Sequence, residues 1–221
     1  MARREDRLRD LAAELDGEYE TCDVADPDRV EEVARAVTAR HERIHLLVNN
    51  AGVRARVGFF DSDPAPIENA MRVNYFGSVW CLRAFLTALE AGAPSDVVNV
   101  VSVAGTVALP RGGPYAATKH AQLAFSRAAA AELRGRGVRV HTVLPGFVHT
   151  EGFPQRNLLR SRVGRRVVVG PEAVADAILR SVDRDRMEVV VPRLYRPASL
   201  VQALAPGLTT RALARRQGRR R

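Results

Sequence analysis

Lysine is almost absent from this sequence. Lysine and arginine together number 34, but 33 of these residues are arginines and the remaining one is Lys119. Arginine keeps its proton under ordinary conditions, whereas lysine is a compact ammonium whose pKa shifts readily on burial and which takes part in proton transfer. Because the chain uses arginine everywhere else, we expect a specific chemical role for the lysine at position 119.

Long apolar runs and cysteines are also scarce. No stretch of about 18 uncharged apolar residues occurs, and residues 1–6, four of which are charged, are not followed by an apolar signal segment. We therefore expect neither a membrane-spanning helix nor export by a signal peptide. The two cysteines, Cys22 and Cys81, lack the spacing of a disulfide framework or a zinc knuckle. A reducing cytoplasm is the simplest setting for such a chain.

Acidic residues are missing from the C-terminal segment. Residues 211–221 contain six arginines and no acid, so only +3 of the net charge of +9 belongs to residues 1–210. Such a run can bind nucleic acid or anionic lipid head groups, but a solvated tail is the simpler interpretation. No helix-turn-helix, zinc-finger or RNA-stacking motif indicates specific nucleic-acid binding. Weak contact of this tail with an anionic surface stays open.

The hydrophobic pattern predicts one α/β domain over residues 1–210. The length and the 46% hydrophobic content are sufficient for a single core. Short apolar runs predict strands at residues 19–24, 44–48, 97–101, 138–144 and 187–191. Helical periodicity predicts helices at residues 3–15, 27–37, 65–89, 115–134 and 171–184, and one or two short helices at 198–216. The helix at 65–89 could alternatively be broken near its start. Residues 147–169 are predicted to form a loop. Nearly continuous apolar strands that alternate with helices are typical of a parallel sheet covered on both faces.

One pattern, from His41 to His45, fits the His-Glu-x-x-His expression of zinc proteases. That chemistry requires both histidines on one face of a helix. A strand is predicted to begin at Ile44, so the two histidines should point in unrelated directions. We therefore predict no metal site.

Tyr115 precedes Lys119 by four residues in a predicted helix. Side chains at this spacing project from one helix face and can act on one ligand. Ser102 closes the predicted strand at residues 97–101. Taken alone, a tyrosine and a lysine four residues apart are a common accident on helix surfaces.

Five motifs that follow one another in order argue against a chance pairing of Tyr115 and Lys119. They are Asn49-Asn50-Ala51-Gly52 after a strand, Asn74 within a helix, Ser102 at a strand end, Tyr115-x-x-x-Lys119, and Pro145-Gly-Phe-Val-His-Thr150. Together they resemble the short-chain dehydrogenase/reductase family, over nearly the whole chain to about residue 192. The resemblance implies a Rossmann-like, doubly wound parallel sheet with its ligand outside the carboxyl ends of the strands. It also implies a small carbonyl or alcohol substrate, and a homodimer or homotetramer formed through helices 65–89 and 115–134.

The resemblance assigns catalytic roles to four of these residues. Tyr115 is the general acid or base that gives a proton to a carbonyl oxygen or takes one from an alcohol. A free phenol has a pKa of about 10, and we expect the Lys119 ammonium to lower it. Ser102 hydrogen-bonds the reacting oxygen, and Lys119 also holds the nicotinamide ribose. Asn74 anchors a water through which protons reach Lys119.

The resemblance also assigns contacts with a nicotinamide cofactor. The residues concerned are Arg3, Asp23, Val24, Asn50, Gly52, Tyr115, Lys119, Pro145, Gly146, Val148 and Thr150. Asp23 matches a position that contacts adenine, although it could simply end a strand. Arg3 matches a position at which a basic residue holds the 2′-phosphate, so NADP is expected ahead of NAD.

The glycine-rich turn that binds the cofactor pyrophosphate is missing, because no glycine precedes Gly17. By the family pattern Met1 lies just after the second strand, so the sheet is expected to be incomplete in its N-terminal part. The predicted strand at 44–48 should then become an exposed apolar edge. We hypothesise that the natural gene product extends upstream, which an intact mass of the endogenous protein that begins at Met1 would refute.

Two functional interpretations follow. The complete set of Asn74, Ser102, Tyr115 and Lys119 favours an NAD(P)-dependent oxidoreductase that interconverts a carbonyl and a secondary alcohol. The missing glycine-rich turn favours a catalytically impaired remnant, or an interaction protein that uses the paired helices 65–89 and 115–134.

Overall fold

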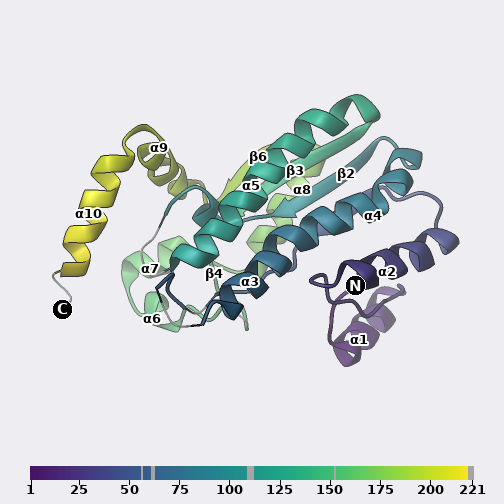
Figure 1. Ribbon diagram of the computed structural model, residues 1–221, viewed down its shortest axis with the longest axis horizontal. Coiled ribbons are helices and arrows are strands. Elements are labelled where there is room, and N and C mark those ends of the chain that lie inside the picture. The colour runs from purple at the N-terminus through teal and green to yellow at the C-terminus, as the bar shows by residue number, and fades with distance from the viewer. Residues whose placement is uncertain (56, 61–62, 109–111, 152, 219–221) are drawn as a thin grey trace.

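The centre of the protein is a parallel sheet of four strands (Figure 1). The computed structural model describes residues 1–55, 57–60, 63–108, 112–151 and 153–218. The strands are β1 (Leu46–Asn49), β2 (Ser95–Val100), β3 (Val138–Pro145) and β6 (Glu188–Val191), in the order β1-β2-β3-β6. Every neighbouring pair is parallel. The prediction of a Rossmann-like parallel sheet is confirmed.

Helices cover both faces of this sheet. Helices α4 (Gly77–Ala91) and α5 (Gly113–Leu133) lie on one face, and α8 (Pro171–Asp183) lies on the other (Figure 1). Val97 packs among side chains of α4 and α5, whereas the next residue, Val98, packs against α8. Neither valine has any exposed surface. Successive strand residues point to opposite faces, so burial of both faces explains the apolar run at Val97 and Val98.

The predicted long helix at residues 65–89 contains an irregular turn. It consists of α3 (Ala65–Met71), a π-helical turn (Arg72–Phe76) and α4. The predicted break is therefore a change of helix type. Asn74 lies within the π-helical turn and is fully buried. Single π-helical turns inside α-helices frequently occur at functional sites.

The N-terminal segment forms two helices, α1 (Glu5–Leu15) and α2 (Pro27–Arg40). Helix α2 begins where the sequence predicts it, because the Asp26 carboxylate accepts hydrogen bonds from two backbone N–H groups of the first turn, at 3.1 and 3.2 Å. It ends at Arg40, so His41 and His45 do not share a helix face.

The prediction of a strand at residues 19–24 is wrong. The described residues show only an isolated bridge there, between Thr21 and Ala2. A strand is stabilised by hydrogen bonds to a neighbouring strand. Here only one described residue, Ala2, pairs with the segment, which is too little to form a strand. The prediction of an apolar edge on the next strand is confirmed: β1 is the outermost strand of the sheet, and Leu46 and Val48 are 44% and 39% exposed.

The prediction of a loop at residues 147–169 is also wrong. This segment contains β4 (Phe147–Val148), α6 (Arg156–Leu159), α7 (Arg162–Val167) and β5 (Val168–Val169), and β4 pairs with β5 in a second, small parallel sheet. Elements of two to six residues are too short to produce a readable hydrophobic period.

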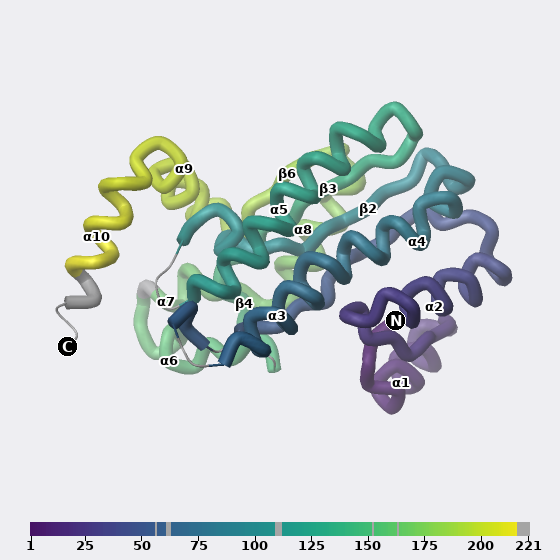
Figure 2. Tube along the Cα trace, viewed as in Figure 1, coloured from purple at the N-terminus to yellow at the C-terminus, as the bar shows by residue number. Residues whose placement is uncertain are grey.

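The C-terminal segment matches its prediction of short helices around Pro206. After a 3₁₀ turn (Arg193–Tyr195), α9 (Arg196–Leu204) and α10 (Pro206–Gly218) extend away from the sheet, as the tube in Figure 2 shows. Among the described residues, no helix combines the length and the apolar character needed to span a bilayer.

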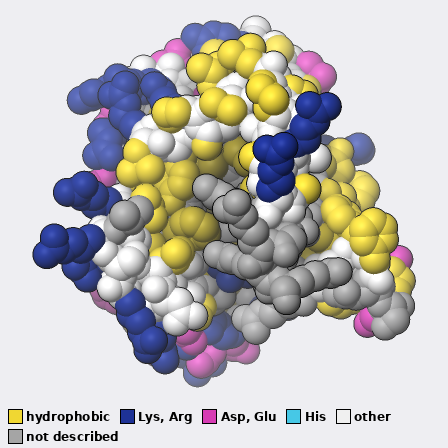
Figure 3. Space-filling view, turned by 90° about the vertical axis from the view of Figure 1, so that its left-hand side faces the viewer, with side chains coloured by type: hydrophobic (Ala, Val, Ile, Leu, Met, Phe, Trp, Pro, Cys, Tyr) yellow, Lys and Arg dark blue, Asp and Glu magenta, His cyan; other side chains and the backbone are white. Residues whose placement is uncertain are grey.

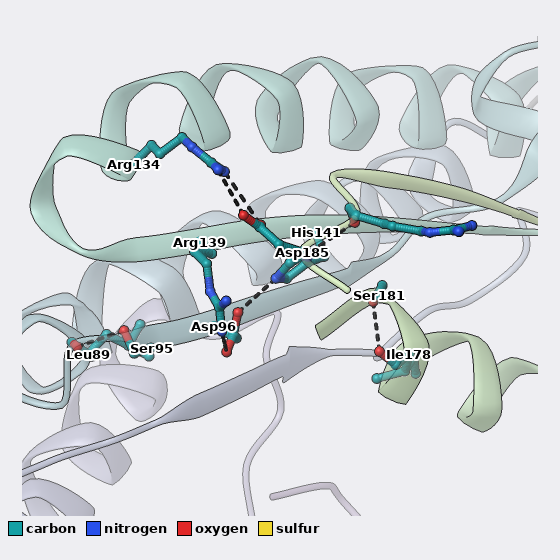
Figure 4. A network of polar contacts seen from close by, with 10 residues as sticks. Leu89, Ser95, Asp96, Arg134, Arg139, His141, Ile178, Ser181 and Asp185 are labelled. Atoms are coloured by element: carbon teal, nitrogen blue, oxygen red, sulfur yellow. Dashed lines mark hydrogen bonds and ion pairs between the residues drawn. The ribbon is translucent and has the colours of Figure 1, made fainter. Parts of the chain in front are cut away.

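A buried polar network connects the amino ends of β2 and β3 (Figure 4). Asp96 accepts hydrogen bonds from His141 Nε2 at 2.8 Å and from Arg139 at 2.7 Å. His141 has no exposed surface, and its Nδ1 lies 3.0 Å from the carbonyl oxygen of Arg186. The network ties β2, β3 and the segment before β6 together, at the end of the strands opposite Ser102.

Candidate active site

Three strands deliver predicted site residues to the same edge of the sheet. Asn50 follows β1, Ser102 follows β2, and Pro145 ends β3. The Ser102 hydroxyl donates to the carbonyl oxygen of Pro145 at 3.3 Å and accepts from the backbone N–H of Ala104 at 3.1 Å. These two bonds fix the serine side chain in the crevice where parallel sheets of this kind bind ligands.

Helix α5 brings Tyr115 and Lys119 to this edge. Lys119 is only 3% exposed, and its Nζ donates to the carbonyl oxygen of Val100 at 3.2 Å and to Gln122 Oε1 at 2.7 Å. Gln122 in turn donates to Ser78 Oγ at 2.8 Å. The Lys119 nitrogen lies 6.0 Å from the centre of the Tyr115 ring. The pair therefore shares one site, as the four-residue spacing predicts.

Asn74 connects the loop after β1 to α5. Its Oδ1 accepts from the backbone N–H of Val53 at 2.8 Å, and its Nδ2 donates to Val53 O and to Thr118 Oγ1, both at 2.9 Å. A Cβ placed on Gly52 would lie 3.5 Å from Asn74 Oδ1 and 3.6 Å from Lys119 Nζ. The exposed backbone of Gly52 thus lies directly over the buried amide and the buried amine.

Burial dominates the electrostatics of the pair. It lowers the pKa of Lys119 to about 7. It also raises the pKa of Tyr115 above its ordinary value, against the opposing effects of a hydrogen bond with Ser102 and the charge of Arg54. We expected the Lys119 ammonium to lower the pKa of Tyr115. In the structure the amine instead hydrogen-bonds with Val100 O and Gln122 Oε1, and it does not contribute to the pKa of Tyr115.

Comparison with known proteins agrees with this arrangement. The family profile described as short chain dehydrogenase matches residues 1–158, which include Ser102, Tyr115 and Lys119. The chain belongs to the short-chain dehydrogenase family. Dehydrogenase/reductase SDR family member 7B of Bos taurus is 30% identical over 218 residues, which cover 91% of this chain and 64% of that relative.

Two further comparisons add a second curated relative and a solved structure. A 1-deoxy-11-beta-hydroxypentalenate dehydrogenase of Streptomyces exfoliatus is 33% identical over 169 residues, covering 75% of this chain and 61% of that relative. A short chain dehydrogenase from Burkholderia cenocepacia, solved in complex with NADP, superimposes with a TM-score of 0.74 at 29% identity, over 87% of this chain and 76% of that one. The chain spans less than two thirds of the length of these two curated relatives.

The remaining predicted cofactor residues of the chain form two groups. Near the end of β3, the N–H of Gly146 donates to Val191 O at 2.8 Å, Val148 lies in β4, and Thr150 Oγ1 accepts from the N–H of Phe153 at 3.1 Å. The Phe153 ring lies 6.3 Å from that of Tyr115, so this group borders the tyrosine.

The second group lies in the N-terminal segment. Arg3 and Asp23 form an ion pair at 3.6 Å, with 66% and 44% of their side chains exposed. Val24 packs against the start of α4, where a Cβ on Gly77 would lie 2.8 Å from Val24 Cγ2. The cofactor contacts assigned to these residues remain predictions.

The structure adds four residues that sequence reasoning missed. Thr118 and Gln122 each lie three positions after a predicted residue on α5, and that spacing could have identified them as neighbours on one helix face. Phe153 and Arg54 lie in loops, and the Arg54 guanidinium carbon stands 4.3 Å from the centre of the Phe153 ring. No sequence signal indicates this contact. Within the described ranges, no group of three or more His, Cys, Asp or Glu side chains is arranged to hold a metal ion.

Proposed function

We propose that this protein is an NAD(P)-dependent oxidoreductase that interconverts a carbonyl and a secondary alcohol in a small molecule. The observation that carries the proposal is the convergence of Ser102, Tyr115, Lys119 and Asn74 at the carboxyl edge of the sheet. The Ser102 hydroxyl opposes the burial that raises the pKa of Tyr115, and the buried lysine has a pKa of about 7. The known relatives whose names describe dehydrogenases support the same class of reaction.

Each residue has a defined part in the proton chemistry. In reduction, the Tyr115 hydroxyl gives its proton to the carbonyl oxygen while Ser102 donates a hydrogen bond to the same oxygen. The raised pKa of Tyr115 keeps the phenol protonated near neutral pH, which suits the acid of a reduction. In oxidation the phenolate takes the alcohol proton. With a pKa of about 7, Lys119 can give or take a proton under the same conditions.

The residues at the carboxyl edge fit the nicotinamide and ribose part of the cofactor, which supplies or accepts the hydride when it is bound. Lys119 Nζ lies beneath the exposed backbone of Gly52, next to the exposed Asn50, so a ribose hydroxyl above Gly52 would be within reach of the amine. No glycine-rich turn precedes Gly17 in these 221 residues, so we assign no pyrophosphate contact. The exposed Arg3 supports NADP ahead of NAD.

The decisive variant is Tyr115→Phe, which keeps the ring beside Phe153 and removes only the hydroxyl. We expect NADPH oxidation against a panel of ketones to fall about 100- to 10,000-fold, the usual contribution of a general acid. Tyr75→Phe is the matched control, because it also removes one phenolic hydroxyl from a tyrosine whose ring contacts a phenylalanine, Phe76. Equal turnover by Tyr115→Phe and the unmodified chain would exclude this mechanism.

Cofactor choice is tested separately by isothermal titration with NADPH and NADH. We expect NADPH to bind more tightly, and Arg3→Gln to remove that difference without weakening NADH. If neither cofactor binds, the chain is the catalytically impaired form, and its function would then be one of association.

A cluster of aromatic side chains supports a homodimer or homotetramer. Phe76 and Trp80 stack with ring centres 5.4 Å apart, and Tyr75 contacts both Phe76 and Phe125. These residues lie on the π-helical turn, α4 and α5, and Phe76 is 39% exposed. Sedimentation equilibrium should show an oligomer that Trp80→Ala weakens.

A further inference from the structure

The positive charge of this protein is concentrated in two segments. After Glu188 the sequence contains eight arginines and no acid, so residues 1–188, with 26 cationic and 25 acidic residues, have a net charge of only +1. The second segment, residues 152–171, contains five arginines and no acid, although Glu151 and Glu172 flank it directly.

The structure brings these two segments together at one end of the molecule. Helices α6 and α7 belong to one segment and α9 and α10 to the other, and all four lie at the same end in Figures 1 and 2. Tyr195 joins the segments: its hydroxyl donates to Val167 O at 2.9 Å, and its ring contacts that of Phe147 at 6.3 Å. We refer to residues 153–169 and 193–215 as the cationic end.

The arginines of the cationic end face solvent without acidic partners. The residues concerned are Arg156, Arg160, Arg162, Arg165, Arg166, Arg193, Arg196, Arg211 and Arg215, and all are exposed. None of them forms an ion pair with any residue in the described part of the chain. Elsewhere on the surface, by contrast, Arg40, Arg127 and Arg134 each pair with a carboxylate.

Large apolar side chains are exposed among these arginines. Leu194, Leu200, Val201, Leu204 and Leu208 are 48%, 59%, 52%, 77% and 67% exposed. Helix α9 contains no buried residue. Figure 3 views the molecule from this end and shows hydrophobic side chains gathered there, with Lys and Arg side chains around them. Exposed apolar residues concentrated in this way mark an interaction surface.

We propose that the cationic end docks on the surface of a bilayer that contains anionic phospholipid. Arginines attract the phosphate and carboxylate groups of such lipids, while leucines on the same helices enter the boundary between head groups and acyl chains. A nucleic acid would account for the arginines but not for the five exposed apolar side chains. A second copy would bring like charges face to face, which opposes association.

The docking surface borders the candidate active site. Helix α6 begins three residues after Phe153, whose ring contacts Tyr115 at 6.3 Å. Docking would therefore place the candidate active site close to the lipid. The proposal itself depends only on the charges and apolar residues of the cationic end, so it can fail or succeed independently of catalysis.

The test is vesicle flotation with the purified full chain. We expect flotation with vesicles of phosphatidylcholine and phosphatidylserine, little with phosphatidylcholine alone, and release by added salt, because exposed charges are screened. Each arginine near an anionic surface strengthens binding about fivefold, so Arg211→Gln with Arg215→Gln should weaken it about 25-fold. Arg35→Gln with Arg184→Gln is the matched control, because both residues are exposed and lie outside the cationic end.

A second pair of variants tests the apolar contribution. Leu204→Ser with Leu208→Ser should weaken vesicle binding without changing the net charge, whereas Leu11→Ser with Leu179→Ser should not, although these leucines are 50% and 59% exposed. Urea denaturation of all variants establishes that each is folded. Equal binding to both vesicle types, equal loss in the control variants, or tighter binding to duplex DNA than to the anionic vesicles would each overturn the proposal.

Discussion

Replacement of Lys119 by methionine should reveal the energetic cost of burying the one lysine. Lys119 is 3% exposed, and burial lowers its pKa from 10.5 to about 7. Each pKa unit corresponds to about 1.4 kcal/mol, so the protonated amine costs the folded state about 5 kcal/mol. Methionine fills a similar volume without a charge, and it leaves Val100 O and Gln122 Oε1 without this donor.

The sign of the pH dependence follows from the lowered pKa. Below about pH 7 the amine is protonated in both the folded and the unfolded chain, so the folded state bears the full cost. Between about pH 7 and pH 10.5 only the unfolded chain holds the proton, so stability rises by about 1.4 kcal/mol per pH unit. Above that range the amine is neutral in both states and the cost is gone.

Urea denaturation of both proteins between pH 6 and pH 10 measures this effect. All other titrating groups are shared, so they cancel in the difference between the two free energies of unfolding. We expect the unmodified chain to gain about 4 kcal/mol relative to Lys119→Met between pH 7 and pH 10. Selective labelling also gives a single lysine side-chain signal in NMR, because the chain has one lysine. A difference that is independent of pH, or a lysine that titrates near 10.5, would refute the reasoning.

Three further substitutions test contacts on which the fold depends, each by urea denaturation at neutral pH. Asn74→Ala removes three hydrogen bonds of 2.8 to 2.9 Å from a fully buried site and should cost about 2–4 kcal/mol; no loss would mean that the loop after β1 is held by other contacts. Gly146→Ala places a Cβ against the Tyr195 ring and should cost about 1–3 kcal/mol from overpacking, an effect that Tyr195→Ala should relieve. Asp96→Asn replaces the buried carboxylate that hydrogen-bonds with His141 and Arg139, and should cost about 1–3 kcal/mol; a neutral effect would show that the network is dispensable.

Helix positions were predictable because their signals are local. Asp26 and Pro27 mark the first turn of α2 within two residues, and the same carboxylate caps that turn in the structure. Tyr115 and Lys119 were predicted as a pair for a similar reason, since a four-residue spacing on a helix fixes their relation without reference to the rest of the fold.

The positions of the strand and loop segments could not be predicted as well, because they depend on contacts with distant residues that a local sequence pattern does not contain. Residues 19–24 have the composition of a strand, but pairing requires a neighbour, and Ala2 supplies only one bridge. The segment at 147–169 forms α6 and α7, whose four and six residues give no periodic signal. Their positions depend instead on contacts with distant residues, such as the bond from Tyr195 to Val167.

The site shows the same division between local and distant information. Sequence reasoning identified Ser102, Tyr115 and Lys119, but the partners of Lys119 could not be predicted with them. Val100 belongs to the adjacent strand β2, and it meets the amine only because α5 packs across that strand. The same packing buries the amine and lowers its pKa, so the electrostatics of the site follow from the fold and not from the motif.

This burial explains why position 119 is a lysine in a chain of arginines. An arginine retains its proton even when buried, so its charge would have to be stabilised by Val100 O and Gln122 Oε1 alone. A lysine with a pKa of about 7 can instead lose its proton in the unliganded site. The space above it lies next to the exposed backbone of Gly52, where a Cβ would be 3.6 Å from Nζ. A hydroxyl or an anion bound there would accept a hydrogen bond from the ammonium and favour its protonated form. We therefore expect a ligand bound there to favour proton uptake by Lys119, a coupling that an arginine at this position could not provide.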